Sequence, residues 1–247
     1  MTRPDPLSLL HNDADIVVIN KPAGLAVIPG RAETDTVIER LAAQLGLPCR
    51  GSADPRVRVV HRLDKDTSGV LMFAKHVAAQ RHLSHQFQNN TIEKEYLALV
   101  VGRPAESSGE IDAALAPHPT QKEKMAVSRH GRPAVTRWQI EQTMRRFTLL
   151  RVFPKTGKTH QIRVHLAHIG HRLAIDALYG SPDPILLSQH KRRYRPTRDE
   201  EERPLIARLT LHAHKLSFDH PNGSGRATIE APLPKDFRAT IAQLIKA

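Results

Sequence analysis

Short apolar runs separated by turn signals recur along the whole chain. Three of them, at residues 15–20 (DIVVIN), 69–74 (GVLMFA) and 146–154 (RFTLLRVFP), have the length and side-chain types of buried strands. A strand of this kind buries its apolar side chains only by joining a sheet. No repeat and no long linker divides the 247 residues. The sequence therefore predicts one mixed α+β domain with a largely antiparallel sheet and flanking helices.

Helical periodicity marks the elements expected to flank this sheet. Residues 36–46 carry an apolar stripe, and Thr36 and Glu39 are spaced as a capping box. Residues 159–170 show a similar stripe, with Thr159 as the expected N-cap. Further helices are predicted at 76–90 and 235–247.

Turn-forming residues concentrate in the second half of the chain. We predict loops across 103–136, and a division into two lobes at this segment is the alternative to an undivided domain. The HPNGSG turn at 220–225 predicts a hairpin between strands at 208–218 and 226–232. Residues 183–204 are a charge-dense, Pro-bounded excursion from the helix and strand pattern.

Charge indicates the class of partner. Lys and Arg number 37 against 25 Asp and Glu, which gives a net charge of +12. Such an excess favours a polyanion, and nucleic acid is the partner we expect. Aromatic residues make up only 4%, which argues against stacking on many bases. The alternatives are a basic protein with no such partner, or one that touches acidic lipid.

The compartment follows from what the sequence lacks. No run approaches the ~20 apolar residues of a membrane span, and the first residues do not resemble a signal peptide. The single cysteine, Cys49, excludes a disulfide framework. We expect a cytoplasmic protein with no membrane contact.

Asp64 lies in a turn between two apolar runs, within RVVHRLDKDTSGVLMFAK at 58–75. Loops at strand ends commonly carry catalytic groups, and the neighbouring cations Arg62 and Lys65 favour an ionised carboxylate. The alternative is that Asp64 caps the turn and pairs with Arg62. For Asp66, turn capping is the expected role.

Metal binding is not predicted at either candidate segment. Asp64 and Asp66 match the first positions of a calcium loop, but Lys75 occupies the place of the bidentate glutamate. His165 and His168 are three residues apart on a predicted helix, yet an arginine lies beside them and no carboxylate ligand is near.

A second dense segment, KTGKTHQIRVHLAHIGH at 155–171, combines cations with a helix start. Lys155, Lys158 and His160 precede the helix, and a helix N-terminus attracts anions. We expect these three side chains to face the phosphates of a nucleic acid. A solvated, charged helix is the alternative.

Three segments together resemble the RluA-type family of RNA pseudouridine synthases: 61–75, 87–102 and 156–171. The resemblance extends over a core of about 13–235. It implies a pseudouridine synthase catalytic domain that isomerises specific uridines in structured RNA, exchanging an N-glycosidic for a C-glycosidic bond. No cofactor is implied, and the RNA is a ribosomal or transfer RNA stem-loop.

The resemblance also implies roles for single residues. The family's essential aspartate falls on Asp64, which acts as nucleophile or as base toward a sugar proton. Its active-site tyrosine falls on Tyr96, and the basic partner of its aspartate falls on Arg163. Arg62 is the candidate to fill the gap left by a flipped base. Lys94, on the same side of its strand as Tyr96, is expected to contact RNA.

Many members of this family carry a small RNA-binding domain in front of the catalytic one. The motif here begins near residue 13, so we expect a single catalytic domain over 1–247, without that extra domain and monomeric. Within 183–204, the basic residues Lys191, Arg192 and Arg193 are expected to add an RNA contact, and a solvated loop is the alternative.

Two other functions compete with this prediction. A non-catalytic RNA-binding protein would share the charge but would not need Asp64, Tyr96 and Arg163 together. A metal-dependent nuclease would need clustered carboxylates, which the sequence does not offer.

Because no segment offers a complete ligand set, we predict that isomerisation does not require a metal. EDTA should leave tritium release from uridine labelled at carbon five unchanged, in an RNA that folds without magnesium. Loss of the activity with EDTA and its recovery with zinc or calcium would contradict this prediction.

Overall fold

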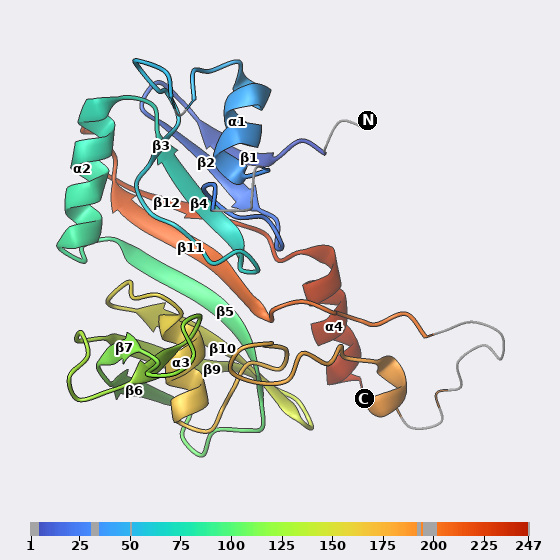
Figure 1. Ribbon diagram of the computed structural model, residues 1–247. Coiled ribbons are helices and arrows are strands. Elements are labelled where there is room, and N and C mark those ends of the chain that lie inside the picture. Colours follow the sequence, from blue (N-terminus) through green and yellow to red (C-terminus); the bar gives the residue numbers. More distant parts are fainter. Residues whose placement is uncertain (1–4, 31–34, 50, 192–193, 195–201, 247) are drawn as a thin grey trace. The chain divides into compact units, whose positions relative to one another are not determined.

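The computed structural model describes residues 5–30, 35–49, 51–191, 194 and 202–246 (Figure 1). The fold class is α+β with a large, mostly antiparallel sheet, which confirms the predicted class. Contacts within the chain form two compact units. Unit 1 comprises Met1–Glu95 and Ala213–Pro232, and unit 2 comprises Tyr96–His212 and Leu233–Ala247.

The boundary between the units does not lie where a division was considered. It falls within strands β5 (Glu93–Val101) and β11 (Leu211–Asp219), and not in the segment 103–136. A division within this one segment was the alternative to an undivided domain, because loops often join domains. Here two strands each pass from one unit to the other. The single-domain organisation stays a prediction.

Unit 1 is built on antiparallel strands with two helices. β2 pairs with β1 and β4, and β11 pairs with β12 in the predicted hairpin. β3 and β11 also pair with β4. The elements of this unit besides β11 are β1 (Ser8–Asn12), β2 (Ile16–Lys21), α1 (Val37–Leu45), β3 (Arg58–Val59), β4 (Ser68–Ala74), α2 (Val77–Gln88) and β12 (Arg226–Glu230).

Unit 2 has the strand order β5-β10-β9-β6, all antiparallel, and a separate β7–β8 hairpin. Its elements besides β5 are β6 (Ser108–Asp112), β7 (Leu115–Pro117), β8 (Met125–Val127), β9 (Val135–Thr143), β10 (Phe147–Pro154), α3 (Gln161–His168), the 3₁₀ helix η1 (Leu187–Gln189) and α4 (Lys235–Ile245). The prediction of loops across 103–136 was therefore wrong where this segment forms the short strands β6, β7 and β8 and the start of β9. Each of these strands is stabilised by pairing that a local pattern does not reveal.

The two long helices of unit 2 contribute to different apolar clusters. Leu99 of β5 belongs to a cluster with Phe237 of α4. The next residue, Val100, belongs to a cluster with Leu166 of α3. Because successive side chains of a strand point to opposite faces, α3 and α4 cover opposite faces of this sheet. Among the described residues, no helix has both the length and the apolar character needed to cross a membrane.

Helix α1 begins and ends where the sequence predicts. Thr36 is its N-cap and Gly46, in the left-handed region at φ 62°, is its C-cap. The expected capping box does not form. The Thr36 hydroxyl donates to the Glu39 carboxylate (2.9 Å), and the Thr36 side chain does not accept a hydrogen bond from the helix N–H groups.

Helix α3 begins later than predicted. Its N-cap is His160, at φ 54°, and not Thr159. The Gln161 carboxamide oxygen accepts hydrogen bonds from the Lys158 N–H (3.0 Å) and the Thr156 hydroxyl (2.7 Å). The Gln161 side chain thus holds the preceding loop in a tight turn. His160, in the left-handed region, connects this turn to the first residue of the helix.

Gly69, in β4, stands where two strands of unit 1 approach closely. Its φ is +117°, and a Cβ atom built on it would lie 2.1 Å from the Ala213 carbonyl oxygen on β11. Backbone strain and a backbone clash therefore both exclude a side chain here.

We predict that Gly69→Ala lowers the free energy of unfolding by roughly 3–5 kcal/mol, since it adds an overpacked contact to an unfavourable φ. Gly223→Ala is the matched control, because Gly223 also has a positive φ (+80°) but open space around it. The control should cost about 1–2 kcal/mol. Equal losses in denaturant unfolding would show that the contact with Ala213 is unimportant.

Candidate active site

Asp64 lies in a tight turn between β3 and β4 of unit 1. The Thr67 N–H donates to the Asp64 carbonyl oxygen (3.1 Å), which closes the turn. Leu63 and Thr67 are buried, Asp64 is half-buried, and Arg62 and Asp66 are exposed. The turn is thus anchored by its buried residues and presents its polar ones.

A buried lysine lies against this turn. Lys21, at the end of β2, is fully buried, and its Nζ donates to the carbonyl oxygens of Pro22 and Lys65, at 2.7 Å each. The Gly24 N–H donates to the same Lys65 oxygen (3.0 Å). The carbonyl oxygen of Lys65, the residue after Asp64, therefore accepts two hydrogen bonds. Sequence reasoning treated this stretch only as a turn and missed Lys21, although a lysine ending a buried strand is itself a signal.

His61 holds the beginning of the same turn. Its ring stacks on Phe87 of α2 at a centroid distance of 4.6 Å, and its Nε2 accepts a hydrogen bond from the Met72 N–H (3.0 Å). Burial, with a smaller effect of the Lys94 charge, lowers the pKa of His61 to about 3. The ring is therefore neutral at physiological pH and serves as a fixed acceptor.

Tyr96 is the first residue of unit 2 and lies on β5, opposite Val152 of β10. It is half-buried and packs against the cluster that contains Ala98. This confirms the predicted alternation, in which Tyr96 and Ala98 share one side of the strand. Lys94 precedes it, half-buried, in unit 1.

Arg163 of α3 forms a buried, two-pronged ion pair with Asp176. Its Nε and Nη2 donate to the two carboxylate oxygens at 2.8 and 2.7 Å. The N–H groups of Leu178 and Tyr179 donate to Asp176 as well (2.9 and 3.1 Å). Burial by itself raises the pKa of Asp176, but the bonds from Arg163 outweigh it, and the pKa lies below its ordinary value. The pair therefore stays ionised and fixes the guanidinium plane.

Tyr179 joins this ion pair to the loop before α3. The Arg163 guanidinium carbon lies 5.1 Å from the centre of the Tyr179 ring. The Met125 N–H donates to the Tyr179 hydroxyl (2.7 Å), and that hydroxyl shares a hydrogen bond of 2.8 Å with His160 Nδ1. His160 is thus held in place, while Lys155 is exposed and Lys158 half-buried.

The excursion at 183–204 is tied down at its base. Ile185 and Ile206, both buried, form an antiparallel bridge. Lys191 is exposed. Arg192 and Arg193 lie outside the described residues.

The histidines of α3 do not offer a metal site. His165 is buried; its Nε2 donates to the Ala113 carbonyl oxygen and its Nδ1 accepts from the Thr136 hydroxyl, both at 2.9 Å. Burial lowers the pKa of His165, which keeps the ring neutral in this role. His168 is exposed, so the two histidines do not share a face.

Another group of potential ligands, in unit 1, comprises His11, Asp13 and His220. Both Nε2 atoms donate to Asp13 Oδ2, at 2.8 and 2.9 Å. The Nδ1 of His220 accepts from the Asn222 N–H, so its proton resides on Nε2, where a metal would have to bind. The donor set therefore suits a hydrogen-bonded clamp around Asp13 better than a metal.

The comparisons with known proteins identify the class. Residues 15–168 match the model of the family described as RNA pseudouridylate synthase, and the chain belongs to this family. It is an enzyme of the RNA pseudouridine synthase class, as the resemblance of its motifs indicates.

Particular relatives are proteins named ribosomal large subunit pseudouridine synthase D. That of Haemophilus ducreyi is 38% identical over 97% of this chain and 71% of its own length. That of Nitrosomonas europaea is 41% identical over 96% of this chain. The chain spans 64% of the length of the second relative.

A solved structure supports the same fold. The human RNA Pseudouridylate Synthase Domain Containing 4 superposes with a TM-score of 0.72 at 25% sequence identity. The superposition covers 96% of this chain and 92% of the human one. The roles of Asp64, Tyr96 and Arg163 stay predictions.

We predict that Asp176→Asn lowers the free energy of unfolding by about 3–5 kcal/mol, because it removes the charge of the carboxylate that accepts two hydrogen bonds from the buried Arg163 guanidinium. Glu110→Gln is the control, since Glu110 pairs with Arg137 at the surface, where such a change costs within about 1 kcal/mol. Urea unfolding of both variants at neutral pH makes the comparison. Equal, small losses would contradict a structural role for the pair.

The pH dependence gives a second check of the same pair. The pKa of Asp176 is lower in the folded protein, so its contribution is complete above the ordinary aspartate pKa and declines as the pH falls through the folded value. The stability difference between wild type and Asp176→Asn should be constant above about pH 5 and shrink below about pH 4.

Proposed function

We propose that the protein isomerises specific uridines of ribosomal RNA to pseudouridine, with Asp64 as its essential carboxylate. The observation that carries the proposal is the 38–41% identity, over nearly the whole chain, to proteins named ribosomal large subunit pseudouridine synthase D. The net charge of +12 supports a polyanionic substrate. A transfer RNA substrate has no comparable support.

The reaction exchanges one bond of the nucleoside for another. The bond between N1 of uracil and C1′ of ribose breaks, the base turns, C5 bonds to C1′, and the C5 proton leaves as N1 gains one. Asp64 acts either as the nucleophile at C1′ or as the base that removes a sugar proton, and each route requires the ionised carboxylate. No net oxidation occurs, so the chemistry needs no redox cofactor.

The surroundings of Asp64 support its role as a positioned group. Lys21 holds the Lys65 carbonyl oxygen within the turn, and His61, just before the turn, accepts a hydrogen bond from the Met72 N–H of β4; both bonds are partly buried. A reactive group held this way loses little freedom when the substrate arrives, which favours the reaction.

We assign the neighbouring roles by the same family match. The Tyr96 ring stacks on the target base. Arg163, whose orientation Asp176 maintains, is the basic partner of Asp64. Arg62 is exposed and basic, and it fills the space that the flipped uridine leaves in the RNA.

Basic side chains hold the RNA in this proposal. They are Lys94, Lys155, Lys158 and His160, with Lys191 and the two arginines that follow it in the sequence. We also propose that the protein acts as a monomer in the cytoplasm.

We predict that Asp64→Asn abolishes turnover and leaves RNA binding intact or slightly tighter. An amide is neither a nucleophile nor a base at this centre, and the RNA phosphates meet one fewer negative charge. The measurements are tritium release from uridine labelled at carbon five, RNA affinity by filter binding, and circular dichroism to verify folding.

Asp66→Asn is the matched control, because Asp66 lies in the same turn, two residues away, and is exposed. It removes the same charge and should retain turnover. A folded Asp64→Asn variant that makes pseudouridine at nearly the wild-type rate would remove Asp64 from the mechanism. RNA binding without turnover by the wild type would favour the non-catalytic alternative.

A further inference from the structure

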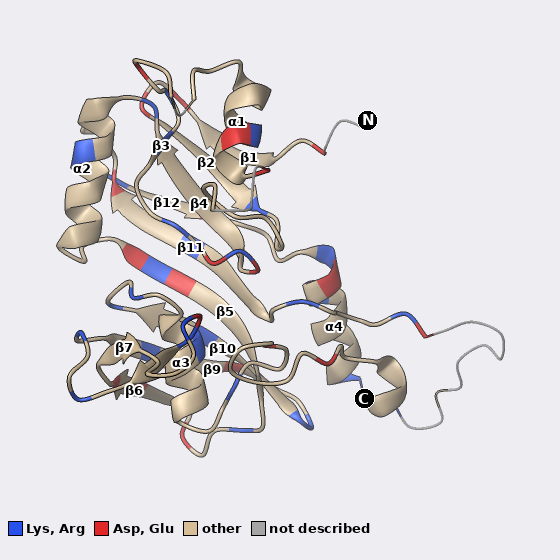
Figure 2. Cartoon of the chain, viewed as in Figure 1, with Lys and Arg blue, Asp and Glu red and all other residues tan. Residues whose placement is uncertain are grey.

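The tip of the β9–β10 hairpin carries two adjacent arginines in unit 2. Arg145 and Arg146 are the central residues of a two-residue turn, which a hydrogen bond from the Met144 N–H to the Phe147 carbonyl oxygen closes (2.9 Å). Figure 2 shows this tip as basic. The Gly102 N–H donates to the Arg146 carbonyl oxygen (2.9 Å), which fixes the turn against the end of β5.

Two arginines are an unusual choice for such a turn. Two-residue hairpin turns favour Asn and Gly, which accept a positive φ. Neither Arg145 nor Arg146 has a positive φ, so this turn does not use the preferred backbone geometry. Local backbone preference therefore does not explain the two arginines, and departures of this kind are expected at functional sites.

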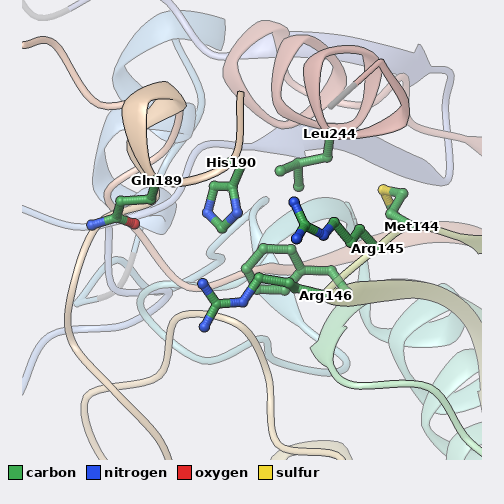
Figure 3. A pocket seen from close by; sticks show the side chains of 7 residues that line it. Met144, Arg145, Arg146, Gln189, His190 and Leu244 are labelled. Carbon is green, nitrogen blue, oxygen red and sulfur yellow. The ribbon is translucent and has the colours of Figure 1, made fainter. Parts of the chain in front are cut away.

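The arginines line a small hollow that is open to solvent (Figure 3). His190, just after η1, contributes its imidazole, and its ring meets Phe147 edge-on at a centroid distance of 5.2 Å. Figure 3 shows the two arginine side chains extending from the turn toward His190. The remaining lining residues are Met144, Gln189 and Leu244.

The lining offers hydrogen-bond donors and positive charge. Burial, together with the charges of Arg146 and Arg145, lowers the pKa of His190, so the ring is neutral and contributes one N–H donor. In the part of the chain that the structure describes, neither arginine side chain has an ion pair or a hydrogen bond. Glu202 accepts a hydrogen bond from the Ser188 N–H (2.9 Å) in η1.

We propose that Arg145, Arg146 and His190 form a binding site for a backbone phosphate of the RNA substrate. Guanidinium groups bind phosphate oxygens through paired, charge-assisted hydrogen bonds. The apolar walls of Phe147 and Leu244 strengthen such bonds by excluding water on one side. The proposal rests on RNA being the substrate and adds a contact that the family match does not assign.

The test is the salt dependence of RNA affinity for Arg145→Gln/Arg146→Gln. The probe is a transcribed fragment of large-subunit ribosomal RNA. Loss of one phosphate contact should reduce the slope of log affinity against log salt by about 0.7–0.9. At 0.1 M salt, the affinity should then fall by roughly five- to eightfold.

Arg56→Gln/Arg137→Gln is the charge-matched control. These two arginines are exposed and pair with Asp54 and Glu110, so the variant loses the same charge from surface ion pairs. It should retain the wild-type slope and affinity. An equal effect of both double variants would show that only the overall charge matters and would overturn the proposal.

Phosphate ethylation interference locates the contact. One phosphate should weaken wild-type binding when ethylated and have no further effect on Arg145→Gln/Arg146→Gln. Identical interference patterns for the two proteins would overturn the site. Tritium release by the wild type tests the proposed function separately, because the slope and the interference pattern measure binding alone. A wild type that binds no RNA would overturn both.

Discussion

The buried ion pair between Arg163 and Asp176 is the constraint on which the functional side of unit 2 depends. Two charges that leave water must satisfy each other almost completely, or the fold loses several kcal/mol. The two-pronged contact leaves Arg163 one orientation, and the N–H groups of Leu178 and Tyr179 complete the Asp176 shell. Tyr179, placed in this way, reaches both His160 and Met125. One pair thus aligns a helix, a loop and a strand.

Unit 1 also contains a buried charged side chain, which different groups stabilise. Lys21 buries its ammonium and donates to the carbonyl oxygens of Pro22 and Lys65. Because the Lys65 oxygen belongs to the turn that carries Asp64, this cation organises backbone, whereas Arg163 organises side chains. His61 adds a hydrogen-bond acceptor. Its lowered pKa keeps the ring neutral at physiological pH, so it brings no second positive charge to this turn. In both units, a buried polar group defines the geometry near a proposed functional residue.

The sequence predicts those elements whose stabilising signals are local. Helix α1 follows from its stripe, Thr36 and Gly46, and the β11–β12 hairpin follows from its turn. The start of α3 was misplaced because Gln161 bonds across the loop to β9. β1 and β6 were missed since their pairing partners, not their own patterns, stabilise them. Asp176 has no spacing that links it to Arg163, so only the folded chain reveals the pair. Asp64 was proposed from its place at the end of a strand and from family resemblance, Tyr96 from the resemblance alone, and their roles stay predictions.

The bridge between Ile185 and Ile206 has an evolutionary consequence. It closes the base of the excursion with two buried side chains, and His190 and Leu205 between them also pack against the core. Doubling the length of such a segment adds only about 0.6 kcal/mol to its closure. A change in the length of this segment that keeps Ile185, His190, Leu205 and Ile206 in place therefore carries only a small cost in stability. Evolution can vary the length of the chain here more cheaply than in the strands that the core buries.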